Sequence, residues 1–330
     1  PRPRHPLATA SAATLATLLA ILLFAAPEVA QAQAVVQRVV TASDAWLNVT
    51  SDGVLGNDFT GRTPSFEYPI GSGFEHLTHG GLWIGAHAED GLGPFTGVVT
   101  GGIDQPLAVS PAMLSEWTPV SASFTERSNL PSSALYDPTA LSPDESIVLY
   151  DDRVPKSTAF NPEPNRPVGL RVRQLTHAWN SAGYRDFAVV RFIVTSQTVL
   201  PVHDVWVGLY SDLASGPRDL YSCWPPSGAC GPGGWFSRKR LEWDPAWRML
   251  REHYCRKQPE PDSCHFELVP PWAGVQLLTP PAAGQHVTLA AWNYAPGSST
   301  RDTDAERYAI MSAGTITDLS DPSLRPQTGD

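Results

Sequence analysis

The clearest pattern of apolar and polar positions lies between residues 168 and 210. An apolar residue occupies every second position from 168 to 172, which is the period expected of a strand with one buried face. The runs 187–195 and 202–210 follow and are rich in β-branched and aromatic residues. Short turn signals separate the three runs, so we predict three strands that form an antiparallel meander.

Further strands are expected on both sides of this region. Proline (32 residues) and glycine (26 residues) are scattered through the chain, which favours strands and tight turns over a helical bundle. We expect a loop-rich first part at 35–165 and core strands within 166–214 and 272–312. The fold class predicted is all-β, an antiparallel β-sandwich or a jelly-roll-like domain. The additional strands are predicted at 35–40, 81–87, 146–150, 273–278, 286–294 and 307–311.

Residues 215–271 form a predicted insertion that is rich in proline, glycine, tryptophan and cysteine. It contains one predicted helix, because Asp244 is a suitable N-cap, Pro245 fits the first helical position, and Trp247, Leu250 and Tyr254 recur at helical spacing.

The insertion also holds all four cysteines of the chain. An even number in an exported protein indicates disulfides, and short loops cost least to close. We therefore favour Cys223–Cys230 and Cys255–Cys264 among the three pairings. Zinc is the competing interpretation because two histidines flank the second pair, but neither pair has the spacing of a zinc knuckle.

The first 34 residues resemble an export signal in their layout. A basic start with Arg2 and Arg4 precedes an apolar run at 12–26, and small residues follow up to Ala34. We expect cleavage after Ala34 and a secreted or surface-attached product, 35–330. A membrane anchor is the alternative, although the apolar run is short for a span, and no later stretch is apolar enough to cross a bilayer. Because the chain begins with Pro1, we expect the true start to lie upstream.

Charge argues against nucleic acid as a partner. The chain has 33 acidic and 23 basic residues, a formal net charge of −10. The basic residues do not cluster, so no track for a phosphate backbone is visible. A net negative charge favours solubility and repels anionic surfaces.

The chain contains eleven tryptophans. An exposed indole can stack on a sugar ring, so an exported β-rich protein with many tryptophans suggests binding of glycans or other cell-surface components. Trp83, Trp179, Trp206 and Trp292 lie within strand patterns, and we expect them in the core. The other group crowds the insertion, where it forms either a small core or a sugar-binding surface: Trp224, Trp235, Trp243, Trp247 and Trp272.

An acidic alternation suggests calcium. On an extended segment Asp302, Asp304 and Glu306 would face one way, and carboxylate oxygens are the ligands that calcium prefers. The alternative is a solvated loop in which Arg301 and Arg307 neutralise the carboxylates.

Two further groups have simpler interpretations. His76 and His79 lie among glycines, in a loop or strand where their spacing does not converge on a metal. Asp151 and Asp152 end a predicted strand, and we expect a turn with a local ion pair to Arg153 rather than half of a glycosidase pair.

Four segments together resemble the N-terminal region of large uncharacterised exported bacterial proteins, some of which carry C-terminal secretion-sorting or immunoglobulin-like modules. The segments are GVLGNDF (53–59), FEYPIGSG (66–73), GGLWIG (80–85) and VWVGLYSD (205–212). The resemblance implies an exported protein and supplies no catalytic residue.

Three hypotheses for the function follow. The first is an exported, non-catalytic β-sandwich module with a structural or adhesive role. The second is a carbohydrate-binding module that uses the tryptophan-rich insertion. The third is an exported hydrolase that acts on glycans through two carboxylates on either side of a cleft. Coplanar exposed indoles would favour the second hypothesis, and buried indoles would favour the first.

Overall fold

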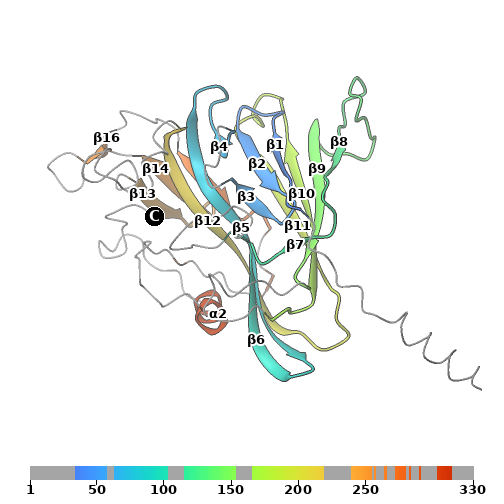
Figure 1. Ribbon diagram of the computed structural model, residues 1–330. Coiled ribbons are helices and arrows are strands. Elements are labelled where there is room, and N and C mark those ends of the chain that lie inside the picture. The colour runs from blue at the N-terminus through green and yellow to red at the C-terminus, as the bar shows by residue number, and fades with distance from the viewer. Residues whose placement is uncertain are drawn as a thin grey trace, which may run out of the picture. The chain divides into compact units, whose positions relative to one another are not determined.

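The computed structural model describes the greater part of residues 34–313 and shows an all-β protein of antiparallel sheets with one helix in that part (Figure 1). This confirms the predicted class. The described residues are 34–57, 63–102, 115–153, 166–218, 239–254, 256–257, 264–265, 272–279, 282–283, 290 and 303–313.

The largest sheet in this part of the chain has seven strands. Its main path runs β1-β2-β3-β5-β12, with β4 and β6 paired beside it. The two longest strands, β5 and β12, lie side by side (Figure 1). The strands are β1 (Gln37–Val40), β2 (Trp46–Thr50), β3 (Val54–Gly56), β4 (Phe66–Glu67), β5 (Phe74–Asp90), β6 (Gly93–Thr100) and β12 (His203–Pro217).

A second sheet follows the order β11-β10-β9-β7, with β8 paired to β9. The segment 35–165 was predicted to be rich in loops. In the structure it contains the strands β1 to β9. The strands of this sheet are β7 (Thr118–Pro119), β8 (Thr125–Arg127), β9 (Asp144–Asp151), β10 (Leu170–Ala178) and β11 (Ala188–Ser196).

The predicted meander is half right. β10 and β11 pair antiparallel from Leu170↔Ser196 to Ala178↔Ala188, as expected. The third strand, β12, instead pairs with β5 in the other sheet. The connection contains Pro201, which has no N–H to donate to a ladder. The chain passes from one sheet to the other at this point.

One apolar cluster joins the two sheets. It includes Leu82 and Ile84 of β5, Tyr150 of β9 and Val172 of β10. Trp117 lies fully buried in the same cluster and donates its indole N–H to the carbonyl of Leu82 at 2.9 Å. The two sheets therefore share a core.

Residues 239–254 form a hairpin, so the helix predicted from Asp244 to Tyr254 is wrong. Asp244 accepts the backbone N–H groups of Ala246 and Trp247 and starts a turn, not a helix. Arg248 has a positive φ of 49°, and the chain returns as a strand. The strands of this region are β13 (Lys239–Asp244), β14 (Met249–Tyr254) and β17 (Ala273–Gln276) in one sheet, and β15 (Arg256–Lys257) and β16 (Cys264–His265) in another.

The strand predicted at 307–311 is also wrong, because α2 (Asp304–Ser312) occupies this segment. Thr303 and Glu306 form a capping box that fixes the start of the helix. The helix lies against β5, β6 and β12, where the missing side chains of Gly85 and Gly208 leave room for Met311. The predicted strand at 286–294 lies outside the described residues, except for residue 290.

Candidate functional site

Three aromatic side chains form a cluster on the β10–β11 hairpin, the half-buried Trp179 and the exposed Tyr184 and Phe187, which we call the hairpin aromatic cluster. Their ring centroids lie 6.0 to 6.4 Å apart. The rings are tilted by 55° to 62° to one another, and the Tyr184–Phe187 pair is edge-to-face, a geometry that aromatic pairs favour. Tyr184 is 55% exposed, and Phe187 is also exposed.

Contacts on two sides fix this hairpin to the rest of the protein. The Trp179 indole donates to the carbonyl of Leu141, an exposed leucine, at 3.2 Å. The backbone N–H of Asp44 donates to the carbonyl of Arg185 at 2.8 Å, and the two side chains form an ion pair. The aromatic rings therefore project from an anchored turn.

Tyr68 provides the remaining tether. Its hydroxyl donates to the Asp186 carboxylate at 3.2 Å. Burial, and then the Asp186 charge, raises the pKa of Tyr68, so the phenol keeps the proton that it donates.

A buried pair of polar side chains, His177 and Glu145, lies beside Trp179. The ring of His177 stacks on the indole with centroids 5.9 Å apart, and its Nδ1 lies 3.1 Å from the Glu145 carboxylate. Glu145 also pairs with Arg127. Burial lowers the pKa of His177, and the Glu145 charge opposes this effect. Trp179 was expected in the core; its half-buried position follows from its place just after β10.

The predicted tryptophan site is only partly within the described residues. Trp247 is 64% exposed in the β13–β14 turn, Trp272 is exposed just before β17, and Trp243 is partly buried. The Arg251 guanidinium lies over the Trp272 ring, 4.6 Å from its centroid. At the other end of β17, the side-chain amide of Gln276 donates to the backbone carbonyl of Trp247. The two exposed indoles therefore flank opposite ends of one strand. Trp224 and Trp235 lie outside the described residues.

The proposed disulfides lie largely outside the described residues. Cys223, Cys230 and Cys255 belong to segments that the structure does not describe, and Cys264 is described only as a backbone position of β16. The pairing stays a prediction.

The acidic alternation has a different geometry from the one expected. Glu306 is engaged in the capping box of α2, and Asp304 lies 3.6 Å from Arg307. The extended arrangement that motivated calcium binding is therefore wrong for these two residues, while Asp302 lies outside the described residues. Across the part of the chain that the structure describes, no three histidine, cysteine or carboxylate groups are placed to hold a metal ion. Calcium binding through all three carboxylates stays untested.

The turn after β9 contains the expected ion pair. Arg153 contacts Asp151 at 2.7 Å. Asp152 accepts three backbone N–H groups, from Val168, Gly169 and Leu170, at 2.6 to 3.0 Å. Burial raises the pKa of Asp152, and these hydrogen bonds oppose the rise. Its role in the structure is to hold the start of β10.

A buried polar chain that the sequence did not indicate links β5, β12 and β14. His76 Nδ1 lies 2.8 Å from the Ser215 hydroxyl, and its Nε2 lies 3.0 Å from the carbonyl of Tyr68. Ser215 in turn lies 2.5 Å from the Glu252 carboxylate. The side chains of His76, Ser215 and Glu252 are all fully buried or nearly so. Because His76 and Ser215 are far apart in the sequence, no local motif marks this group.

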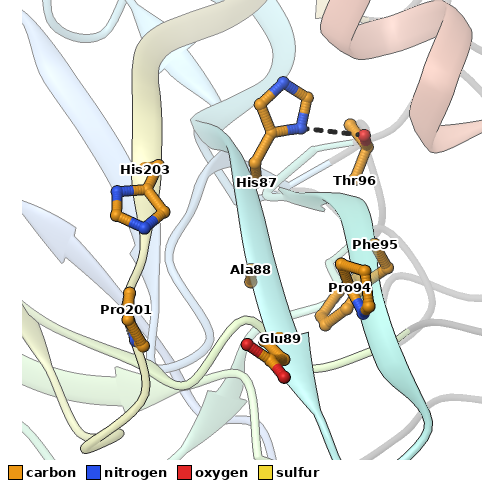
Figure 2. Close-up of a pocket in the computed structure, with 8 residues that line it drawn as sticks. All are labelled: His87, Ala88, Glu89, Pro94, Phe95, Thr96, Pro201 and His203. Atoms are coloured by element: carbon orange, nitrogen blue, oxygen red, sulfur yellow. Dashed lines mark hydrogen bonds between the residues drawn. The ribbon is translucent and has the colours of Figure 1, made fainter.

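A small pocket of about 380 Å³ lies at the end of β5 and the start of β6, beside the start of β12 (Figure 2). His87 donates to or accepts from the Thr96 hydroxyl at 3.0 Å and is the ladder partner of His203. Figure 2 shows the His87 ring directed to Thr96 and the His203 ring beside its own strand, β12. The pocket is lined by His87, Ala88, Glu89, Pro94, Phe95, Thr96, Pro201 and His203.

No protein-family model, curated protein or solved structure matches this chain. Among the described residues, no helix is both long and apolar enough to cross a membrane.

Proposed function

We propose that this protein is an exported, non-catalytic β-sandwich module with an adhesive role, and that the hairpin aromatic cluster is its contact surface. The observation that carries this proposal is an anchored turn that holds three aromatic rings at the surface. The sandwich architecture is supported by the core that the two main sheets share.

Anchored aromatic side chains are well suited to contact. Binding energy at interfaces is concentrated in aromatic residues, because they bury a large area and lose little conformational freedom. Here the tethers of Trp179, Arg185 and Asp186 restrict the hairpin before any ligand arrives. An exposed apolar group on such a support indicates an interaction site.

The buried carboxylates support a structural rather than a catalytic role. The Asp152 carboxylate accepts three backbone N–H groups. The Glu75 carboxylate accepts the backbone N–H groups of Ser65 and Phe66. The Glu116 carboxylate accepts the backbone N–H of Thr100. Each stabilises a loop or strand end in the core region. A glycosidase instead needs two carboxyl groups that face a substrate cleft.

Export remains part of the proposal. The layout of residues 1–34 and the four cysteines supports a leader removed on passage to an oxidising compartment, where disulfides persist.

The carbohydrate-binding alternative has an observation of its own. Trp247 and Trp272 are exposed on the small sheet, and Arg251 stacks on Trp272. Either indole can contact the apolar face of a sugar ring. One binding experiment tests both the hairpin aromatic cluster and the surface formed by Trp247 and Trp272.

The probes are a glycan array and insoluble cellulose, chitin and peptidoglycan, tested with the purified protein. The variant Tyr184→Ser with Phe187→Ser removes most of the exposed hairpin surface, and Trp247→Ser is the matched control. We expect the double variant to lose binding by about tenfold or more, and the control to keep it. Loss in the control alone would move the site to the tryptophan-rich insertion. Absence of binding to every probe by the wild-type protein would overturn the adhesive proposal.

A further inference from the structure

The rings of the hairpin aromatic cluster are almost evenly spaced. The ring centroids of Trp179, Tyr184 and Phe187 lie at the corners of a triangle with sides of 6.4, 6.2 and 6.0 Å. A point above this triangle can lie about 4.5 Å from all three centroids at once, within the roughly 6 Å over which a ring face attracts a cation. Tyr184 and Phe187 are exposed, so a ligand can reach the rings from solvent. One compact group can therefore contact all three rings.

The tilt of the rings limits which ligands fit. The three rings are inclined to one another by 55° to 62°, so they do not form the flat platform on which successive sugars of a polysaccharide stack. A compact, rounded group that meets each ring separately suits this arrangement better. The faces of aromatic rings are electrically negative, so they attract a cation and repel an anion.

The charged side chains on the hairpin and on the groups that support it are, on balance, negative. Three of the four carboxylates pair with arginines. The fourth accepts from the Tyr68 hydroxyl, a neutral donor that does not cancel its charge. The groups are the carboxylates of Asp44, Asp137, Glu145 and Asp186, and the guanidinium groups of Arg127, Arg185 and Arg191. The net charge of −10 on the whole chain also attracts cations.

The imidazole beside Trp179 adds no positive charge of its own. His177 stacks on the indole with ring centroids 5.9 Å apart. Burial lowers the pKa of His177, which favours the neutral ring. His177 therefore supports Trp179 without repelling a cation on the cluster.

Hydration distinguishes between the possible cations. A lysine ammonium is strongly hydrated, and aromatic faces offer it no oxygen acceptors in exchange for the water that it loses. A quaternary ammonium group has no N–H donor, and its methyl groups form an apolar surface around the charge. Proteins recognise such groups with clusters of aromatic rings.

We propose that the hairpin aromatic cluster binds a quaternary ammonium group of the choline type. The inference rests on the proposed function, because it names the ligand of the same contact surface. The rings of Trp179, Tyr184 and Phe187 contact the cation, and the tethers of the hairpin hold these rings in place before the ligand arrives.

Nuclear magnetic resonance of the ligand tests the proposal with the purified protein. Protons above a ring face are shifted upfield, so the methyl signal of choline should move upfield as protein is added. Dimethylbutanol is the matched probe, since it has the shape of choline with a carbon in place of the nitrogen and no charge. We expect it to bind about tenfold more weakly than choline, because it lacks the attraction of a cation to three rings.

Leucine variants keep an apolar side chain and remove the ring. Tyr184→Leu and Phe187→Leu should each weaken choline binding by about threefold or more, whereas Tyr184→Phe keeps the ring and should retain most of the affinity. Tyr136→Leu is the matched control, since Tyr136 is an exposed tyrosine in the loop after β8, and it should bind choline as the wild type does. The unfolding midpoint of each variant shows that it is folded.

Vesicles identify the carrier of the choline group. Sedimentation with phosphatidylcholine but not phosphatidylglycerol vesicles would assign a lipid head group. Binding of soluble phosphocholine without binding to vesicles would assign a carrier other than lipid. Both results support a choline site.

The failure of this inference is distinguishable from the failure of the adhesive proposal. An unshifted choline signal, equal binding of choline and dimethylbutanol, or unchanged binding by both leucine variants would overturn the inference. Surface binding that is lost in Tyr184→Ser with Phe187→Ser but is not inhibited by choline would also overturn it, and would leave the adhesive proposal in place. Choline binding by a protein that adheres to none of the surfaces would support the inference and overturn the adhesive proposal.

Discussion

Among single residues, His76 is a buried titratable group whose surroundings predict a pH dependence. Both ring nitrogens are engaged: Nε2 with the carbonyl of Tyr68, and Nδ1 with the Ser215 hydroxyl. Since a carbonyl accepts only, Nε2 carries the proton of the neutral ring. Ser215 links this ring to Glu252, because its hydroxyl donates to the Glu252 carboxylate at 2.5 Å.

This arrangement predicts acid sensitivity. Burial lowers the pKa of His76 from 6.5 to about 4, so the folded protein holds a neutral ring over a range in which the unfolded chain takes up a proton. Stability should therefore fall as the pH drops from 6.5 to 4, by about 3 kcal/mol at most from this residue. Denaturant unfolding across this range should show a smaller decrease in His76→Gln than in the wild type.

One control variant isolates the contribution of His76. His87 is exposed, so His87→Gln should keep the pH dependence of the wild type. Burial raises the pKa of Glu75, so the folded state takes up a proton at this carboxyl more readily than the unfolded chain does. This difference increases stability as the pH falls, opposite to the effect of His76. Comparison of variants at each pH cancels that effect. A His76→Gln variant with the full acid sensitivity of the wild type would contradict the assignment.

At the scale of elements, close approach of backbones depends on glycine. A Cβ on Gly81 of β5 would lie 2.3 Å from the carbonyl oxygen of Gly101. Gly101 in turn donates its N–H to Leu82. The chain after β6 therefore passes directly against β5, and Trp83 donates its indole N–H to the carbonyls at this crossing.

Gly81→Ala should therefore destabilise the protein by about 3 kcal/mol, because backbone atoms, not a flexible side chain, would have to move. Gly91→Ala is the matched control, since a Cβ there meets no atom within 4 Å. Its effect should stay within about 0.5 kcal/mol. The midpoint of urea unfolding measures both. Equal stability of the two variants would show that the crossing is looser than described.

The sequence predicted the elements whose pattern is local and missed those that depend on distant partners. Alternation located β10, β11 and β12, but it carries no information on which sheet β12 joins. The segment after Asp244 fits a helix start as well as a turn, and the pairing of β13 with β14 decided between them. The capping box of Thr303 and Glu306 was readable from the sequence, yet the acidic alternation was interpreted as extended.

The candidate site was harder to predict for the same reason. Trp179 has the setting of a core strand residue, and its place just after β10 leaves it only half-buried. Tyr184 and Phe187 lie in a turn that gives no sign of the tethers to Asp44, Tyr68 and Leu141. Tethers between residues distant in the sequence decide whether a turn presents its aromatic side chains or leaves them free.

At the scale of the whole molecule, Trp117 connects the two main sheets. It is fully buried, donates to Leu82 in the seven-stranded sheet, and packs on Tyr150 of the second sheet with ring centroids 5.4 Å apart. Tyr150 itself donates to Gln174. A group that contacts both sheets couples their stabilities, so the two sheets should unfold together.

Trp117→Phe tests this coupling. The smaller ring leaves a cavity and removes the hydrogen bond to Leu82, which together should cost about 2 to 3 kcal/mol. Far-UV circular dichroism and tryptophan fluorescence should report one shared transition, shifted equally by both probes, whereas Trp247→Phe in the exposed turn should change it little. If the sheets were independent, the variant would show two separate transitions and only one of them would move. The shared core, and with it the proposed sandwich, would then have to be abandoned.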